Sequence, residues 1–137
     1  MEVNSLKINE RIAALENMKM QILWENPNPN QDFPTQVVTL SSSDYDFLDF
    51  YFARSSDITG RSFRLQCRLI RGFNGMMSSI FGDQSGSQIE MRIREIGWVS
   101  YSQFRFGNGL VKQVGETTAT TRNDILIPEI IVGVKGF

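Results

Sequence analysis

Apolar residues near the N-terminus recur with a helical period, which predicts a helix over residues 6–22. The a and d positions of its heptads carry Ile8, Ile12, Leu15 and Ile22, with Lys19 as a polar interruption. Such a seam is typical of helices that associate around a common axis. Asparagine alternates with Pro27 and Pro29 directly afterwards, so the helix is expected to end near Trp24.

Two interpretations of this helix remain open. An amphipathic helix packed against the chain's own β domain would show the same apolar spacing. Ala13 and Ala14 favour self-association instead. Arg11 and Glu16 do the same, because they place opposite charges at the g and e positions. A seam of roughly two to three heptads is too short to be stable alone, so the rest of the chain must share the contacts of an oligomer.

After the proline segment the apolar pattern changes to the period of two that is typical of strands. Two segments show it most clearly, with apolar residues at Phe63, Leu65, Cys67 and Leu69, and at Ile89, Met91 and Ile93. The alternate positions are polar and include Arg68, Arg92 and Arg94. We therefore expect two half-buried strands whose arginines lie on the outer, solvated face.

The segment 45–53 is apolar on both faces, as in a central strand of a sandwich or a strand at a subunit interface. Other strands are expected over residues 37–40, 98–106, 110–114 and 125–134. Asn108-Gly109 predicts a two-residue hairpin turn. The glycine-rich segment 72–87 and the polar segment 115–124 are expected to be exposed loops.

This order of elements predicts an all-β fold with two parts. Residues 1–24 are expected to form a short N-terminal coiled-coil stalk. Residues 25–137 are expected to form a jelly-roll-like β-sandwich, which is the natural packing for about seven or eight short strands.

Composition narrows the classes of function. The chain has 14 basic and 15 acidic residues and a net charge of −1, so no strong field favours nucleic acid or anionic membranes as partners. Cys67 is the single cysteine, which excludes an intrachain disulfide. No signal peptide and no apolar stretch of about 20 residues is apparent, so synthesis in a cytoplasm is expected.

The sequence offers little for catalysis. Histidine is absent, which removes the commonest general base and metal ligand. Cys67 falls on the apolar side of a predicted strand, where an inert thiol is expected. Asp44, Asp46 and Asp49 could supply a pair of carboxylates for glycoside hydrolysis, but alternation places Asp49 on the opposite face. No catalytic residue, metal site or cofactor is predicted.

Binding to a sugar is the more plausible chemistry. Aromatic residues in segment 98–106 could stack on sugar rings, although most large aromatics in strands are buried. Tyr101 would share a mixed polar strand face with Val99, Gln103 and Arg105. Tyr101, Gln103 and Arg105 are therefore the predicted ligand-binding residues.

Several segments resemble a known family. They are 23–29 (LWENPNP), Phe33, 36–40 (QVVTL), 44–48 (DYDFL), 127–130 (IPEI) and 133–136 (GVKG). Together they are similar to a C-terminal domain of bacteriophage tail, baseplate and fibre proteins. The resemblance covers most of residues 23–137, with distinctive motifs only at its two ends. It implies a trimeric structural protein of the virion that sometimes binds a receptor, and it implies no catalytic residues.

The resulting hypothesis is a homotrimeric appendage of a virion, with Ile8, Ile12, Leu15 and Ile22 as the oligomerisation seam. Its N-terminal end would contact other virion proteins, and its β domain would bind bacterial surface polysaccharide. One rival hypothesis is a structural adaptor of the virion without a host ligand. The other is a small glycan-degrading enzyme.

Overall fold

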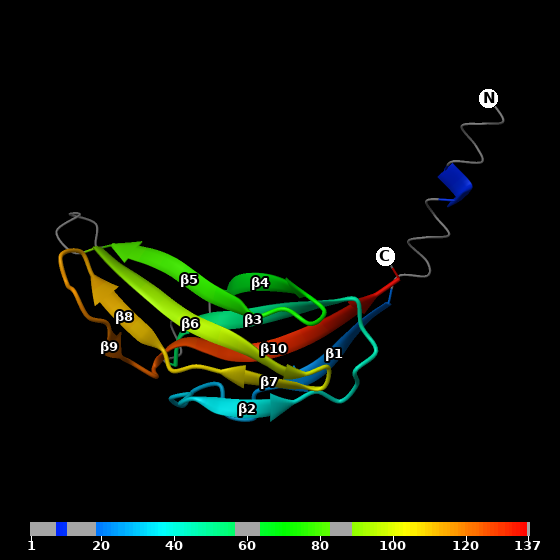
Figure 1. Cartoon of the computed structure of the whole chain (residues 1–137), viewed down its shortest axis with the longest axis horizontal. Helices are drawn as coiled ribbons and strands as arrows, with labels where there is room; N and C mark the ends of the chain where they lie inside the picture. Colours follow the sequence, from blue (N-terminus) through cyan, green and yellow to red (C-terminus); the bar gives the residue numbers. More distant parts are fainter. Residues whose placement is uncertain (1–7, 11–18, 57–63, 83–88, 137) are drawn as a thin grey trace.

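A computed structural model describes residues 8–10, 19–56, 64–82 and 89–136 (Figure 1). Within them, ten strands form two antiparallel sheets. Sheet A has the order β1 (Lys19–Glu25), β10 (Ile125–Lys135), β3 (Phe47–Ser55) and β4 (Arg64–Ile70). Sheet B contains β2 (Gln36–Thr39), β7 (Gln103–Phe106), β6 (Ile89–Ser100), β8 (Leu110–Gln113) and β9 (Thr120–Thr121), with β5 (Gly75–Gly82) also paired to β6. The expectation of an all-β fold is confirmed.

The core lies between the two sheets and is rich in phenylalanine. Phe50 and Phe52 of β3 and Phe104 and Phe106 of β7 are fully buried. Phe50 meets both phenylalanines of β7 edge to face, with ring centroids 5.5 and 5.9 Å apart. Each ring contributes about 1.5–3 kcal/mol by burial, so these contacts hold sheet A against sheet B.

Strand β3 is central in sheet A, as its apolar faces predicted. It pairs with β10 on one side and with β4 on the other. Strand β10 is central too, because β1 pairs with its other edge. The C-terminal segment is therefore a paired strand and not a frayed end.

The predicted helix is wrong over its last turn. Residues 8–10 form a helical turn, and residues 11–18 lie outside the described part of the chain. Residues 19–25 form β1, in which Ile22 pairs with Val132 of β10. The expected boundary at residue 24 thus falls inside a strand of sheet A. A short apolar run is compatible with the helical period and with the strand period. Pairing with β10 makes this segment a strand.

The face of β6 that was predicted to be solvated faces the core instead. Arg94 and Ile96 are buried, whereas Ile89 and Met91 are 45% and 42% exposed. Ile96 pairs with Phe106, whose ring belongs to the core, and the period of two then carries Arg94 inward. Apolar residues expected in the core therefore face outward.

Two turns also differ from the prediction. Segment 98–106 is a hairpin whose turn contains Tyr101, and not one strand. Asn108-Gly109 is no hairpin, because β7 and β8 both pair with β6 and lie end to end along it. Positive φ, which that turn type needs, is found at neither residue. A side chain at position 109 would lie 2.1 Å from the carbonyl oxygen of Arg122, so close packing explains this glycine.

The two expected loops contain strands. Residues 75–82 of the glycine-rich segment form β5, which pairs with β6 along its whole length. The threonine-rich segment contributes β9. Among the described residues no helix is long and apolar enough to cross a membrane.

Candidate functional site

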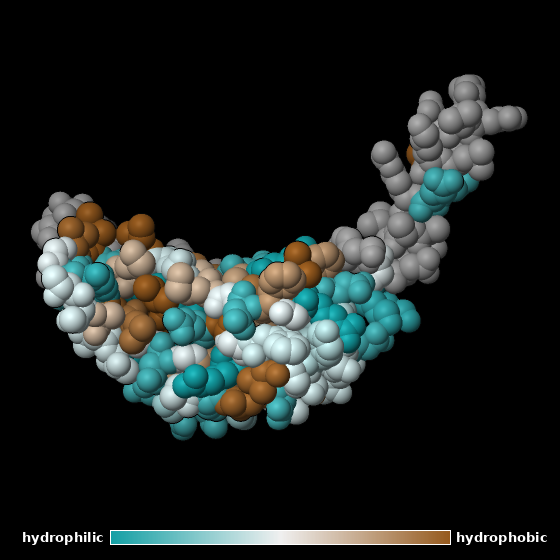
Figure 2. Space-filling view, viewed as in Figure 1, coloured by the Kyte–Doolittle hydropathy of each residue, from teal (hydrophilic) through white to brown (hydrophobic). Residues whose placement is uncertain are grey.

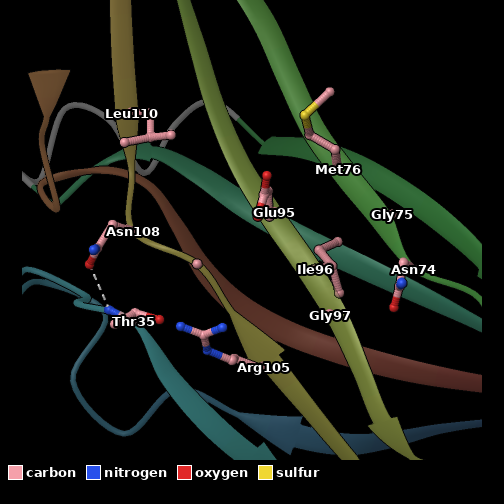
Figure 3. A pocket seen from close by; sticks show the side chains of 11 residues that line it. Thr35, Asn74, Gly75, Met76, Glu95, Ile96, Gly97, Arg105, Asn108 and Leu110 are labelled. Carbon is pink, nitrogen blue, oxygen red and sulfur yellow. Dashed lines mark hydrogen bonds between the residues drawn. The ribbon is translucent and has the colours of Figure 1, made fainter. Parts of the chain in front are cut away.

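An open groove of about 520 Å³ lies on the outer face of sheet B, over β5, β6 and β7 (Figure 3). Its floor is formed by Gly97 of β6 and by Gly107, which follows β7. Gly97 pairs with Arg105, and the amide of Gly107 donates to the carbonyl oxygen of Glu95 at 2.9 Å. Gly97 thus lies opposite Arg105 and Gly107 lies opposite Glu95. The two glycines are diagonal neighbours on the outward face and leave bare backbone between these larger residues.

The backbone conformation at Gly97 does not require glycine, but the missing side chain leaves the groove open. The φ of Gly97 is not in the left-handed region. A Cβ atom added there would lie 3.5 Å from its nearest neighbour, the carbonyl oxygen of Arg105, which is an ordinary contact. Larger residues would therefore fit the strand but would fill the groove.

Two opposite charges border the floor. Arg105 extends from β7 and Glu95 from β6, and both are exposed. Neither forms an ion pair with another described residue. Both charged groups are therefore available to a ligand.

Asparagine side chains stand at the ends of the groove with their oxygens already engaged. The Oδ1 atom of Asn108 accepts a hydrogen bond from the amide of Thr35 at 2.9 Å, drawn in Figure 3. The Oδ1 atom of Asn74 accepts from the amide of Trp98 at 2.7 Å. These bonds fix the orientation of both side chains and leave their NH₂ groups free to donate.

An exposed aromatic pair lies outside the groove lining, at the end of the β6–β7 hairpin. Trp98 pairs with Phe104, whose ring is in the core, so Trp98 lies on the other face of sheet B from the groove. Trp98 and Tyr101 meet edge to face, with ring centroids 5.5 Å apart. The guanidinium carbon of Arg71 lies 4.1 Å from the Tyr101 ring centroid. Tyr101 is 46% exposed, and its carbonyl oxygen accepts a hydrogen bond from Tyr45 at 2.8 Å. The ring is therefore held in place and yet accessible.

No protein-family profile, curated protein sequence or solved structure matches this chain. The side chains of the groove themselves therefore indicate its chemistry. Hydrogen-bond donors, one carboxylate and a floor of bare backbone suit a polar ligand whose ring can lie close to the sheet.

The three predicted ligand-binding residues occupy different places. Arg105 lines the groove. Gln103 precedes it on the same face of β7 and lies 3.5 Å from the hydroxyl of Thr39, outside the lining. Tyr101 lies in the turn and faces Trp98, so it does not share a strand face with the other two.

Sequence reasoning missed Glu95, Asn74 and Asn108. These residues are up to 34 positions apart in the chain and meet only through the pairing of β5, β6 and β7. One signal was present, because Gly97 and Gly107 interrupt strands that otherwise carry large outward side chains.

The predicted seam is only partly described. Ile8 lies in the helical turn and is exposed, and Ile12 and Leu15 fall outside the described residues. Ile22 lies on β1 and is exposed on sheet A. Because Ile22 lies in a strand, it cannot belong to the predicted helical seam.

The acidic cluster does not form a catalytic pair. Asp44 binds the ammonium group of Lys135, a hydrogen bond that lowers the pKa of the Asp44 carboxyl. Asp46 accepts from the amide of Gly136 at 3.0 Å, and buried Asp49 forms a bidentate ion pair with Arg68 at 2.7 and 2.9 Å. Each carboxylate is thus engaged by a different partner. The described residues contain no group of three metal-ligating side chains.

Cys67 is expected to react slowly with iodoacetamide. Burial raises the pKa of its thiol, and the negative charge of Asp49 raises it further. Because the thiolate is the reactive form, alkylation of the folded protein should accelerate at a higher pH than alkylation of the urea-unfolded chain. Rates measured between about pH 7 and 10 test this. Identical pH profiles for both states would contradict it.

Proposed function

We propose that the chain is a trimeric structural protein of a bacteriophage virion, in a tail fibre or baseplate, and that its β domain binds a glycan of the host surface. The observation that carries the binding proposal is the open groove that Arg105 and Glu95 border on the outer face of sheet B. Sugars offer hydroxyl groups to polar side chains and apolar C–H faces to aromatic rings. Arg105 and Glu95 supply the first kind of contact, and the bare backbone at Gly97 and Gly107 lets an apolar ring face approach the sheet closely.

The family resemblance supports the virion assignment. Its two distinctive motifs lie at opposite ends of the sequence and are joined in sheet A. The amide of Asn26 donates to the carbonyl oxygen of Glu129 at 2.8 Å, and its side chain donates to that of Pro128 at 2.9 Å. Trp24 pairs with Ile131 two residues further along each strand. The two motifs therefore lie side by side in one local unit of the fold.

The position of the chain ends supports a stalk-and-head arrangement. Lys19 at the start of β1 pairs with Lys135 at the end of β10. The start of β1 and the end of β10 therefore lie together at one end of the β domain (Figure 1). An N-terminal helix there would hold three β domains together and contact other virion proteins, with Ile8, Ile12 and Leu15 in its seam.

A structural adaptor without a host ligand is the second candidate. Apolar side chains gather in patches among polar ones at the end of the molecule where β5, β6 and β8 lie (Figure 2). Ile80 is 72% exposed and Val114, next to β8, is 78% exposed. A surface of this kind favours contacts with other proteins.

We expect the full chain to be a trimer and to adsorb to a susceptible bacterium. Light scattering should give three times the chain mass of 15.6 kDa. Ile12→Asp should lower that mass, because three carboxylates would meet without partners at the axis. Adsorption should fall by about 10²–10⁴, because linked weak sites gain that much from multivalency.

Glu10→Gln is the matched control, since the exposed Glu10 lies outside the a and d positions and should leave the mass unchanged. A monomeric full chain would contradict the trimer. A trimer that adsorbs to no susceptible strain would favour the adaptor, and release of reducing sugar from host polysaccharide would favour the enzyme.

A further inference from the structure

We infer that the groove recognises a saccharide that carries a carboxylate, such as a uronic acid residue, with Arg105 as the carboxylate partner. This inference rests on the proposed glycan-binding function and specifies its ligand class. The groove is the sheet-face cavity defined above by Arg105, Glu95, Gly97, Gly107, Asn74 and Asn108.

The groove offers an excess of hydrogen-bond donors. Arg105 presents a guanidinium group with no ion-pair partner among the described residues. Asn74 and Asn108 present NH₂ groups, because their oxygens are occupied by backbone amides. Opposite these donors, Glu95 is the single carboxylate in the lining. Such a site is complementary to a ligand rich in acceptors, and a carboxylate is the strongest acceptor for a guanidinium.

The donors are unevenly distributed along the groove. Figure 3 shows the guanidinium of Arg105 turned toward Thr35 and Asn108, while Glu95 extends elsewhere. The hydroxyl of Thr35 donates its one proton to the carbonyl oxygen of Phe106 at 2.9 Å, so the donors at this end are Arg105 and Asn108. A ligand carboxylate would therefore bind at the Arg105 and Asn108 end. Neutral hydroxyl groups would donate to Glu95, which would repel a second carboxylate there.

The floor of the groove favours a saccharide over an acidic peptide. A peptide that extends a sheet needs unpaired backbone groups along an edge. Here β6 lies between β5 and β7, and Gly97 is already paired with Arg105. The bare backbone at Gly97 and Gly107 instead allows a flat ring to approach closely. A volume of about 520 Å³ is in the range of sites for small ligands.

Binding of a matched pair of saccharides to the full-length protein tests the charge preference. The probes are a uronic acid oligosaccharide and the same oligosaccharide with its carboxyl groups reduced to alcohols. Calorimetry should give at least about tenfold tighter binding for the acidic form, because only that form can pair with the guanidinium. Equal binding, or tighter binding of the reduced form, would overturn the inference.

Arg105→Gln should remove this preference. Affinity for the acidic oligosaccharide should fall about tenfold, while affinity for the reduced form changes little. Lys112→Gln is the control, since Lys112 faces outward on β8 in the same sheet and lies outside the groove lining. It removes the same charge and should leave both affinities unchanged. A preference that survives Arg105→Gln would overturn the role of Arg105.

Gly97→Val tests the location of the site independently of charge. The backbone at Gly97 accommodates a side chain, and valine favours strands, so the melting temperature should be unchanged or higher. The valine would fill the floor and abolish binding of the acidic oligosaccharide. Retained binding in a folded Gly97→Val protein would overturn the groove as the site.

The outcomes separate this inference from the proposed function. If the trimer adsorbs to cells through a neutral glycan, the proposed function stands and the inference fails. If the acidic oligosaccharide binds in the groove but the chain is monomeric and adsorbs to no strain, the inference stands and the proposed function fails. An oligoglutamate peptide that binds more tightly than the acidic oligosaccharide would overturn the saccharide assignment.

Discussion

Replacing Arg94 with methionine should lower the free energy of unfolding by about 3–5 kcal/mol. The side chain is fully buried in the core face of sheet B. Its guanidinium donates to the carbonyl oxygens of Phe33, Gly107 and Ile125 at 2.7, 2.9 and 2.8 Å. It thus joins the segment before β2, the break between β7 and β8, and the start of β10. Methionine would leave three carbonyl groups without this donor, two at buried hydrogen bonds and one at a part-buried one.

Burial lowers the pKa of Arg94 to about 10. The unfolded-state pKa is higher, so the folded protein holds this proton less tightly than the unfolded chain does. The resulting cost to stability is fully present at neutral pH and would be recovered only as the pH rises through about 10. The guanidinium therefore stays charged at neutral pH and depends on its three carbonyl partners.

Thermal melting followed by circular dichroism measures the effect of Arg94→Met. The melting temperature should fall by about 10–20 °C if unfolding is two-state. Arg105→Gln is the control, because it removes an exposed arginine from the same sheet and should change stability by less than about 0.5 kcal/mol. Similar melting of the wild type and Arg94→Met would show that the three carbonyl bonds contribute little net stability.

Deleting residues 130–137 should abolish soluble folding. The deletion removes most of β10, which lies between β1 and β3 and pairs with both. Buried Ile131 and Val134 are lost as well, each worth about 1.5–3 kcal/mol. Against a total stability of about 5–15 kcal/mol, these losses and two unpaired strand edges leave no stable sandwich.

Solubility after expression and the far-ultraviolet spectrum of any soluble protein test this deletion. Removal of residues 136–137 alone is the control, because it lies beyond the end of β10. The shorter deletion should leave a folded protein that melts close to the wild type. A soluble, cooperatively melting protein after the longer deletion would refute the central role of β10.

The sequence by itself determined the class of fold and its most apolar strands. Apolar residues on both faces of β3 predicted its central position, and alternation located β4. These predictions succeeded because strand formation and burial on both faces leave a local pattern in the residues. Of the side chains that border the groove, the sequence indicated Arg105, on a predicted strand.

Tertiary structure decided the remaining features. A period of two does not say which face is inward, and the pairing of Ile96 with Phe106 turned Arg94 into the core. The apolar residues of segment 19–25 matched both the helical and the strand period. Pairing with the free edge of β10 made the segment a strand. Asn74, Glu95 and Arg105 meet because three antiparallel strands align in one register. Such register is set by contacts between distant segments, which no local pattern of residues contains.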